Sequence, residues 1–231
     1  MIADNLRKIR QKIALICQHT GRNLSEITLV AVTKSASPEQ IQEVIAAGII
    51  DIAENRIQEA QKKYLALRDR PIKFHLVGHL QTNKVKAAIE IFDLIHSVDS
   101  VHLAQEIEEQ AAKAQKAVDI LLQVNVSGEE TKFGLNPGEV ADLLKEIAGL
   151  KHIRVKGLMT IAPLVDNPEK TRSFFRQLRE LRDKLNALHL TPYTLRDLSM
   201  GMTDDYRVAI EEGATLLRIG RAIFDTQMNT D

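Results

Sequence analysis

The stretch Thr28-Leu29-Val30-Ala31-Val32-Thr33-Lys34 is followed closely by Ser37-Pro38-Glu39-Gln40, and these two segments decide the fold class. The first is rich in β-branched residues, which favours a strand. In the second, the serine can cap a helix, the proline fits a first helical turn, and the glutamine can complete a capping box. The sequence therefore predicts a strand, a turn and a helix in succession.

The same alternation recurs along the chain. Further strands are expected at Asp51–Glu54, Lys73–Val77, Leu94–Val98, Asp119–Val126, Val155–Ile161, Thr194–Ser199 and Leu216–Ile219. A helical pattern follows each strand except the last, with Asn136-Pro137 and Ser100 opening two of these helices and one helix expected from Asp204 to Glu212. An extra helix, with Leu6, Ile9 and Ile13 on one stripe, precedes the first strand.

Strands such as Ile120–Val124 are apolar nearly throughout, which is typical of a parallel sheet covered by helices outside and filled with side chains inside. Eight such units predict an α/β fold, a single (β/α)₈ TIM-type barrel domain over residues 1–231. A doubly wound open sheet is the competing architecture, although its usual Gly-x-Gly-x-x-Gly turn after the first strand is absent.

Composition narrows the classes of function. The 31 basic and 31 acidic side chains cancel, so no strong field attracts nucleic acid or an anionic membrane surface. The single cysteine, Cys17, lies on the apolar side of a helical pattern, which indicates core packing and a reducing compartment. Without a signal-peptide pattern or a long apolar run, the chain is expected in the cytoplasm.

In a barrel of this kind the working site lies at the carboxyl ends of the strands. Lys34 ends the first strand, where Val30 and Val32 face the same side. An amine held against an apolar wall is poorly solvated, and its neutral form attacks aldehydes. The alternative is a lysine that extends out of the barrel mouth into solvent.

Two glycine-containing loops follow the seventh and eighth strands. Leu198–Thr203 combines the Ser199 hydroxyl with a glycine, Gly201, that lets a ligand approach the main chain, and Arg218–Arg221 repeats this with Gly220. Loops at these positions often bind phosphate in TIM-type barrels, although each glycine alone is also ordinary turn chemistry. Together with Lys34, they predict an aldehyde-binding amine that faces a phosphate pocket.

Arg218 shares a strand face with Gly220 and should therefore point inward. A buried arginine needs a partner: a phosphate, a carboxylate, or the ring nitrogen of a cofactor such as pyridoxal 5′-phosphate (PLP). A charged donor at that nitrogen would leave it unprotonated and make the ring a poor electron sink.

Other polar residues are weaker candidates. His75 and His79 have the spacing of a helical metal pair but straddle a strand end, so no metal site is expected. His96 and His102 have no evident partners, and Lys84 and Lys86 are interpreted as solvated surface.

A set of short motifs, in order over nearly the whole chain, resembles the pyridoxal phosphate homeostasis protein family. These are Val30–Lys34, Glu54-Asn55-Arg56, His75–Lys84, Lys132-Phe133-Gly134, Gly157–Thr160, Leu198–Met202 and Arg218-Ile219-Gly220. That family is similar to the barrel domain of alanine racemase, a fold-type III PLP barrel.

The resemblance implies a Schiff base between PLP and Lys34, Arg218 at the pyridine nitrogen and Asn55 near the ring. It also implies phosphate contacts, largely through main-chain amides, from Ser199, Met200, Gly201, Gly220 and Arg221. Family members are regarded as monomeric PLP-binding proteins that affect vitamin B6 and amino-acid balance without established catalysis, with PLP-dependent apoenzymes as possible partners.

The leading functional hypothesis is thus a PLP reservoir or carrier. A weak PLP-dependent amino-acid racemase is the alternative, but racemases that resemble this barrel add a second domain with a catalytic tyrosine. They also have a histidine where this chain has Ile161. A third class is an interaction protein for which PLP is a signal.

Overall fold

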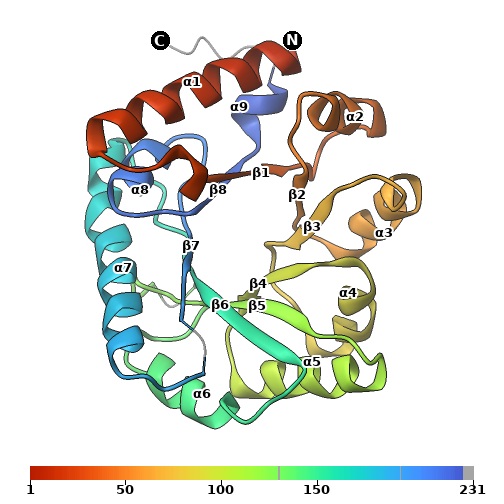
Figure 1. Cartoon of the computed structure of the whole chain (residues 1–231), viewed down its shortest axis with the longest axis vertical. Coiled ribbons are helices and arrows are strands. Elements are labelled where there is room, and N and C mark those ends of the chain that lie inside the picture. The colour runs from red at the N-terminus through yellow and green to blue at the C-terminus, as the bar shows by residue number, and fades with distance from the viewer. Residues whose placement is uncertain (130, 193, 226–231) are drawn as a thin grey trace.

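Eight parallel strands close into one barrel in the order β1 to β8, with the helices arranged around the outside (Figure 1). The structure, a computed structural model, describes residues 1–129, 131–192 and 194–225. The strands are β1 Thr28–Val32, β2 Asp51–Glu54, β3 Lys73–Leu76, β4 Leu94–Val98, β5 Val118–Gln123, β6 Ile153–Met159, β7 Asp197–Ser199 and β8 Leu216–Ile219. The helices are α1 Ile2–Thr20, α2 Pro38–Ala46, α3 Ile57–Leu67, α4 Val85–Ile91, α5 Val101–Lys113, α6 Val140–Ile147, α7 Arg172–Ala187, α8 Tyr206–Glu211 and α9 Arg221–Phe224.

Pairing between β1 and β8 closes the barrel, with Thr28 opposite Leu216 and Ala31 opposite Ile219. An open doubly wound sheet has two unpaired edge strands, so this pairing excludes the competing architecture. The predicted TIM-type barrel with its extra N-terminal helix is therefore confirmed. Residues 226–231 of the predicted domain lie outside the described residues.

The local signals that predicted the first unit are present as expected. Ser37 caps α2 and forms the full capping box with Gln40. Gly48, just beyond the helix, adopts the left-handed conformation with φ of 80°. Ser100 accepts a hydrogen bond from the main chain at the start of α5. These caps place α2 and α5 directly after the strand ends that form the mouth of the barrel.

Several strand boundaries differ from the prediction. β6 runs from Ile153 to Met159 and so begins and ends two residues earlier than predicted. In β5 and β7, side chains or loops form hydrogen bonds with the main-chain groups at the predicted ends. β5 ends at Gln123, since its carbonyl accepts from the N–H of Leu135 (2.9 Å) in the following loop. β7 begins only at Asp197, because the Asn186 side chain of α7 accepts from the N–H of Leu195 (2.8 Å) and donates to its carbonyl (3.0 Å). Both strands are therefore shorter than their apolar patterns suggested.

Two helices begin later than predicted, and one helix was not predicted. Asn136-Pro137 forms a turn closed by Glu139, whose carboxylate accepts from the Asn136 N–H (3.0 Å), and α6 begins only at Val140. The helix expected to open at Asp204 begins at Tyr206. A four-residue helix, α9, follows β8, where no helix was expected.

The interior of the barrel is packed with side chains. Its apolar layer consists of the buried residues Val30, Ala53, Val77, Leu121, Met159 and Leu216. A larger apolar layer, which includes Cys17, fills the space between the strands and the helices. Because the interior is filled, a ligand of cofactor size has room only at the ends of the strands.

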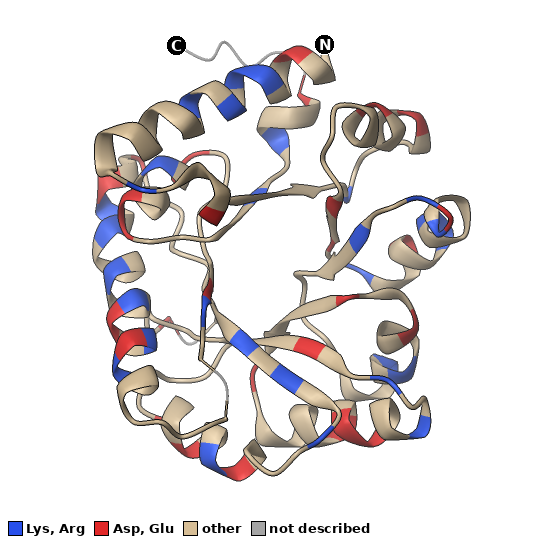
Figure 2. Cartoon of the chain, in the orientation of Figure 1, with Lys and Arg blue, Asp and Glu red and all other residues tan. Residues whose placement is uncertain are grey.

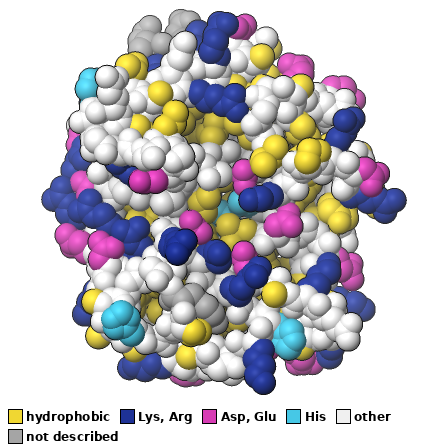
Figure 3. Space-filling view, viewed as in Figure 1, with side chains coloured by type: hydrophobic (Ala, Val, Ile, Leu, Met, Phe, Trp, Pro, Cys, Tyr) yellow, Lys and Arg dark blue, Asp and Glu magenta, His cyan; other side chains and the backbone are white. Residues whose placement is uncertain are grey.

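Charged side chains of both signs occur on the outer helices (Figure 2), and they are interspersed on the face of the molecule shown in Figure 3. That face therefore presents no large surface of one sign. Among the described residues, no helix combines the length and apolar character needed to cross a membrane.

Candidate functional site

Lys34 lies just beyond β1, at the mouth of the barrel, in a turn closed by the Ala36 N–H and the Thr33 carbonyl (2.9 Å). Its side chain is exposed. The expectation of an amine held against an apolar wall is therefore wrong, because the strand ends at Val32 and only Val30 and Val32 pack on the inner layer. The amine is instead accessible from solvent.

The ends of β1 and β8 lie against each other. Val30 is the register partner of Arg218, and a Cβ built on Gly220 would lie 3.3 Å from the carbonyl oxygen of Val32. Since Val32 is two residues before Lys34, the Lys34 turn and the loop after β8 occupy neighbouring positions at the mouth. The two ends of the sequence-predicted site are thus brought together.

The loop after β7 is joined to β8 and to α9 on either side of Gly220. The Arg218 N–H donates to the carbonyl of Gly201 (3.0 Å), and the Ala222 N–H donates to the Thr203 hydroxyl (3.3 Å). Gly201 has φ of 91°, and a Cβ there would lie 2.5 Å from the Cβ of Ala209. A residue other than glycine would be both strained and crowded at this position. Sequence reasoning did not single out Thr203, which lies where the two loops meet.

Ser199 and Met200 are fully buried, so neither side chain is exposed to solvent. The Met200 N–H donates to the carbonyl of Leu216 (3.2 Å). The Ser199 hydroxyl accepts from Arg218 and lies 2.8 Å from Nδ1 of His96. This hydroxyl, which the sequence suggested as a phosphate ligand, is therefore engaged inside the barrel.

Arg218 points inward and is buried, as the strand alternation predicted. Its Nη1 donates to the Ser199 hydroxyl (2.6 Å), and its Nη2 donates to the Thr160 carbonyl (2.8 Å). Burial lowers the pKa of the guanidinium to about 10, while the Asp205 carboxylate opposes this shift. Arg218 therefore remains a cation at neutral pH and is held in a fixed orientation.

Asn55 and Arg221 are both exposed. The Arg221 guanidinium pairs with the carboxylate of Asp204. Asn55 directly follows β2, and a Cβ on Gly78 would lie 2.1 Å from the Asn55 carbonyl oxygen. Only glycine at position 78 permits this close approach of the loops after β2 and β3.

His75 and His79 lie in different places. The exposed His79 stacks on Phe133 with ring centroids 3.9 Å apart, whereas His75 lies inside the barrel with Nδ1 2.9 Å from Nε2 of His96. His96 therefore does have partners, contrary to the sequence interpretation. Burial is the main cause that lowers the pKa of His96 well below its ordinary value, and the neighbouring His75 and Arg218 add to the effect.

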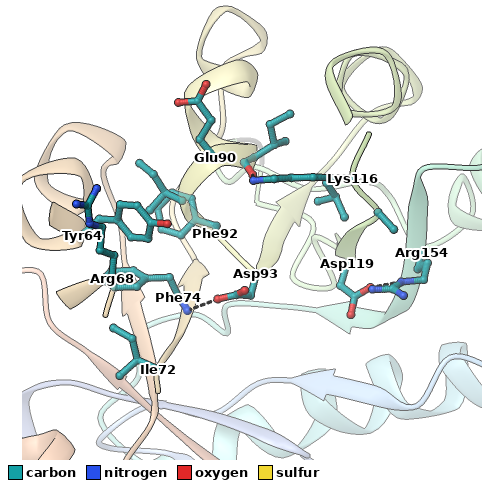
Figure 4. Close-up of a pocket in the computed structure, with 14 residues that line it drawn as sticks. Tyr64, Arg68, Ile72, Phe74, Glu90, Phe92, Asp93, Lys116, Asp119 and Arg154 are labelled. Atoms are coloured by element: carbon teal, nitrogen blue, oxygen red, sulfur yellow. Dashed lines mark hydrogen bonds and ion pairs between the residues drawn. The ribbon is translucent and has the colours of Figure 1, made fainter. Parts of the chain in front are cut away.

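A cavity of about 500 Å³ lies at the opposite end of the barrel, beside the amino ends of β3 to β6 (Figure 4). Asp93 accepts there from the Phe74 N–H (2.7 Å), and Asp119 pairs with Arg154 (2.5 Å). These two carboxylates of the lining are thus already engaged, and the cavity lies away from the loops that contain Lys34, Gly201 and Gly220. No group of three or more described His, Cys, Asp or Glu residues is arranged to hold a metal ion.

The family model described as alanine racemase, N-terminal domain, matches residues 5–227. The fold and this match define the molecule as a barrel of the alanine racemase N-terminal type. An alanine racemase from Clostridium difficile shares the fold, with a TM-score of 0.74, 17% identity, and coverage of 96% of this chain and 56% of that one.

Nearer relatives cover the whole length. The pyridoxal phosphate homeostasis protein of Aquifex aeolicus is 43% identical over 221 residues, which is 96% of each chain. PipY of Synechococcus elongatus, solved with PLP bound, is 34% identical with a TM-score of 0.85, covering 97% of this chain and 100% of that one. The chain therefore belongs to the pyridoxal phosphate homeostasis protein family, as its motifs indicated.

Proposed function

We propose that this chain binds PLP at the carboxyl ends of its strands and takes part in intracellular PLP, or vitamin B6, and amino-acid homeostasis. The observation that carries the proposal is the buried Arg218 cation beside the joined glycine loops and next to the Lys34 turn. The family membership and the PLP-bound structure of PipY support it.

The residues at the mouth fit the groups of this cofactor. Lys34 offers an accessible amine for the aldehyde, and its Nζ would form a C=N bond, a Schiff base, with loss of water. The loops at Gly201 and Gly220 allow a phosphate to approach the main chain. Arg221 and the buried Ser199 and Met200 belong to the same two segments and would complete the phosphate site. Arg218 would face the pyridine nitrogen, and Asn55 would lie near the ring.

We infer that the protein holds the cofactor rather than using it for catalysis. When bound, PLP supplies an electron-withdrawing ring, but the Arg218 guanidinium can only donate hydrogen bonds and would leave the ring nitrogen unprotonated. Ile161, which is 38% exposed just after β6, cannot exchange protons. These features, and the relatives named for homeostasis, favour a carrier over a racemase. We propose that the carrier acts as a single-domain monomer in the cytoplasm.

An absorption spectrum tests the binding proposal. Wild-type protein reconstituted with PLP should show the visible band of a Schiff base, and Lys34→Ala should lose it. Lys73→Ala is the matched control, because Lys73 is an exposed lysine at the amino end of β3. Reconstituted wild type without a Schiff-base band, or Lys34→Ala that keeps it, would overturn the proposal.

Incubation with single-enantiomer amino acids separates the carrier from the racemase. The carrier proposal expects no change of enantiomer by the reconstituted wild type. Conversion that disappears in Lys34→Ala would instead assign a racemase.

A further inference from the structure

A continuous line of polar contacts crosses the interior of the barrel. It links five residues on five different strands: Asp51, His75, His96, Ser199 and Arg218. The separations are 3.1 Å from Asp51 Oδ1 to His75 Nε2, 2.9 Å between the imidazoles, 2.8 Å to the Ser199 hydroxyl, and 2.6 Å from there to Arg218. The Ser199 to His96 contact is between β7 and β4, which are not neighbours in the sheet.

The ends of this line have opposite charge and lie at opposite ends of the barrel. Asp51 opens β2 at the amino end, where its side chain is 16% exposed. Arg218 lies on β8, two residues before Gly220 at the mouth. The three residues between them are buried to 3% exposure or less.

The chemistry of the two ends gives the line a direction. A guanidinium has donors only, so Ser199 accepts from Arg218, and a carboxylate has acceptors only, so His75 donates from Nε2 to Asp51. If both histidines are neutral, His75 must then accept at Nδ1 from Nε2 of His96. His96 in turn accepts at Nδ1 from the Ser199 hydroxyl. Every hydroxyl and imidazole hydrogen in the line is used once.

The reverse order between the histidines is costly. It needs a proton on Nδ1 of His75 in addition to the one on Nε2, which makes His75 an imidazolium inside the barrel. It also leaves the Ser199 hydroxyl hydrogen without His96 as its acceptor. His96 is neutral in both orders, in agreement with its burial, which lowers the pKa of that imidazole well below its ordinary value. The two orders therefore differ in the charge of His75 and in the partner of the Ser199 hydroxyl.

We propose that this line is a one-way hydrogen-bond chain, running from Arg218 to Asp51, that positions the Arg218 guanidinium from inside the barrel. His96 and Ser199 are its positioning residues, and the Thr160 carbonyl fixes the second arm of the guanidinium. The link to the cofactor ring rests on the proposed function, whereas the direction of the chain does not.

Nitrogen-15 spectra of histidine-labelled, ligand-free protein at pH 7.5 test the direction. Both His75 and His96 should carry one proton each, on Nε2, with Nδ1 unprotonated. Their signals are assigned with His75→Gln and His96→Gln, and the exposed His102 serves as the control in His102→Gln. A proton on Nδ1 of His96, or two protons on His75, would overturn the direction.

A change at the amino end tests whether the chain is continuous. Asp51→Asn keeps the shape of the side chain but removes the charge, so the signals of His96 should shift although the two residues are not in contact. Unchanged His96 signals would contradict a continuous chain.

The affinity for PLP tests the positioning. His96→Leu removes both hydrogen bonds and should weaken PLP binding about tenfold, and His96→Gln, which can both donate and accept, should restore part of it. If His96→Leu does not fold, Asp51→Asn provides the same test with a smaller expected loss. Wild-type affinity in these variants would overturn the positioning role. A wild type that takes up no PLP would overturn the proposed function and the link to the ring, while the imidazole pattern would still decide the direction.

Discussion

Lys63 on α3 donates from Nζ to Oε1 of the buried Glu54 (2.7 Å) and to the main-chain carbonyl of Thr33 (2.6 Å). The Thr33 hydroxyl donates to the same carboxylate oxygen (2.5 Å), while no described residue contacts Glu54 Oε2 by a hydrogen bond. Thr33 immediately precedes Lys34, and Glu54 immediately precedes Asn55. This cluster therefore fastens the two turns that carry these proposed cofactor residues.

Replacing Lys63 should destabilise the protein strongly. Lys63→Met leaves the Glu54 carboxylate buried without its cation, which costs on the order of 3–5 kcal/mol. Lys62→Met is the matched control, because Lys62 is exposed on the same helix and should change stability by less than about 0.5 kcal/mol. Urea unfolding of both variants checks the expectation, and equal midpoints would contradict it.

Ser199 and Ser97 are both buried serines but should respond differently to alanine. Ser199→Ala removes the acceptor of Arg218 Nη1 and should cost about 1–3 kcal/mol. Ser97 is the control, since its hydroxyl has no hydrogen-bond partner among the described residues and its loss should be nearly neutral. The free energies of unfolding of both variants test this prediction. A larger loss of stability in Ser97→Ala than in Ser199→Ala would contradict it.

Gly201 and Gly128 separate crowding from backbone strain. Both have positive φ, of 91° and 70°, but a Cβ on Gly128 meets nothing within 4 Å, whereas one on Gly201 overlaps Ala209. Gly128→Ala should cost about 1–2 kcal/mol from strain, and Gly201→Ala about 1–3 kcal/mol more from overlap. Thermal unfolding measures both, and PLP titration should show a loss only for Gly201→Ala. Equal stabilities would rule out the crowding argument.

His96 should make stability depend on pH. Its pKa is lowered in the folded state by burial, then by His75 and Arg218, so the unfolded chain binds a proton more readily. The stabilising effect of neutral His96 is complete above the ordinary histidine pKa of about 6.5. It is lost as pH falls from that value toward the lowered folded-state pKa, by up to about 1.4 kcal/mol per pH unit.

Urea unfolding between pH 7.5 and pH 5 measures this slope. His96→Gln should lack this part of the slope, whereas His102→Gln, altered at an exposed histidine, should retain it. A slope that is the same in His96→Gln and the wild type would assign the pH dependence to other groups.

Much of the fold could be predicted because its signals are local. The β-branched run that ends at Lys34 and the capping box of Ser37 and Gln40 depend only on neighbours in sequence. The inward direction of Arg218 likewise follows from strand alternation.

The contacts of the site could not be predicted in the same way. His96 meets Ser199 across the barrel, 103 residues away, and that meeting depends on the register of every strand between them. The exposure of Lys34 depends on where β1 stops, which an apolar pattern locates only to within a few residues. Lys63 gave no signal, because a lysine on a helix is usually solvated.

The pairing of the first strand with the eighth has a consequence for folding during synthesis. Asn5 on α1 donates to the carbonyl of Ile223, 218 residues away, and β1 pairs only with late strand β8 on that side. The residues of β1 must therefore wait until those of β8 have been synthesised before the ring can close. Until then the Lys34 turn lacks its neighbour from β8, so a nascent chain has the proposed aldehyde-binding lysine long before it has the two glycine loops proposed to bind the phosphate.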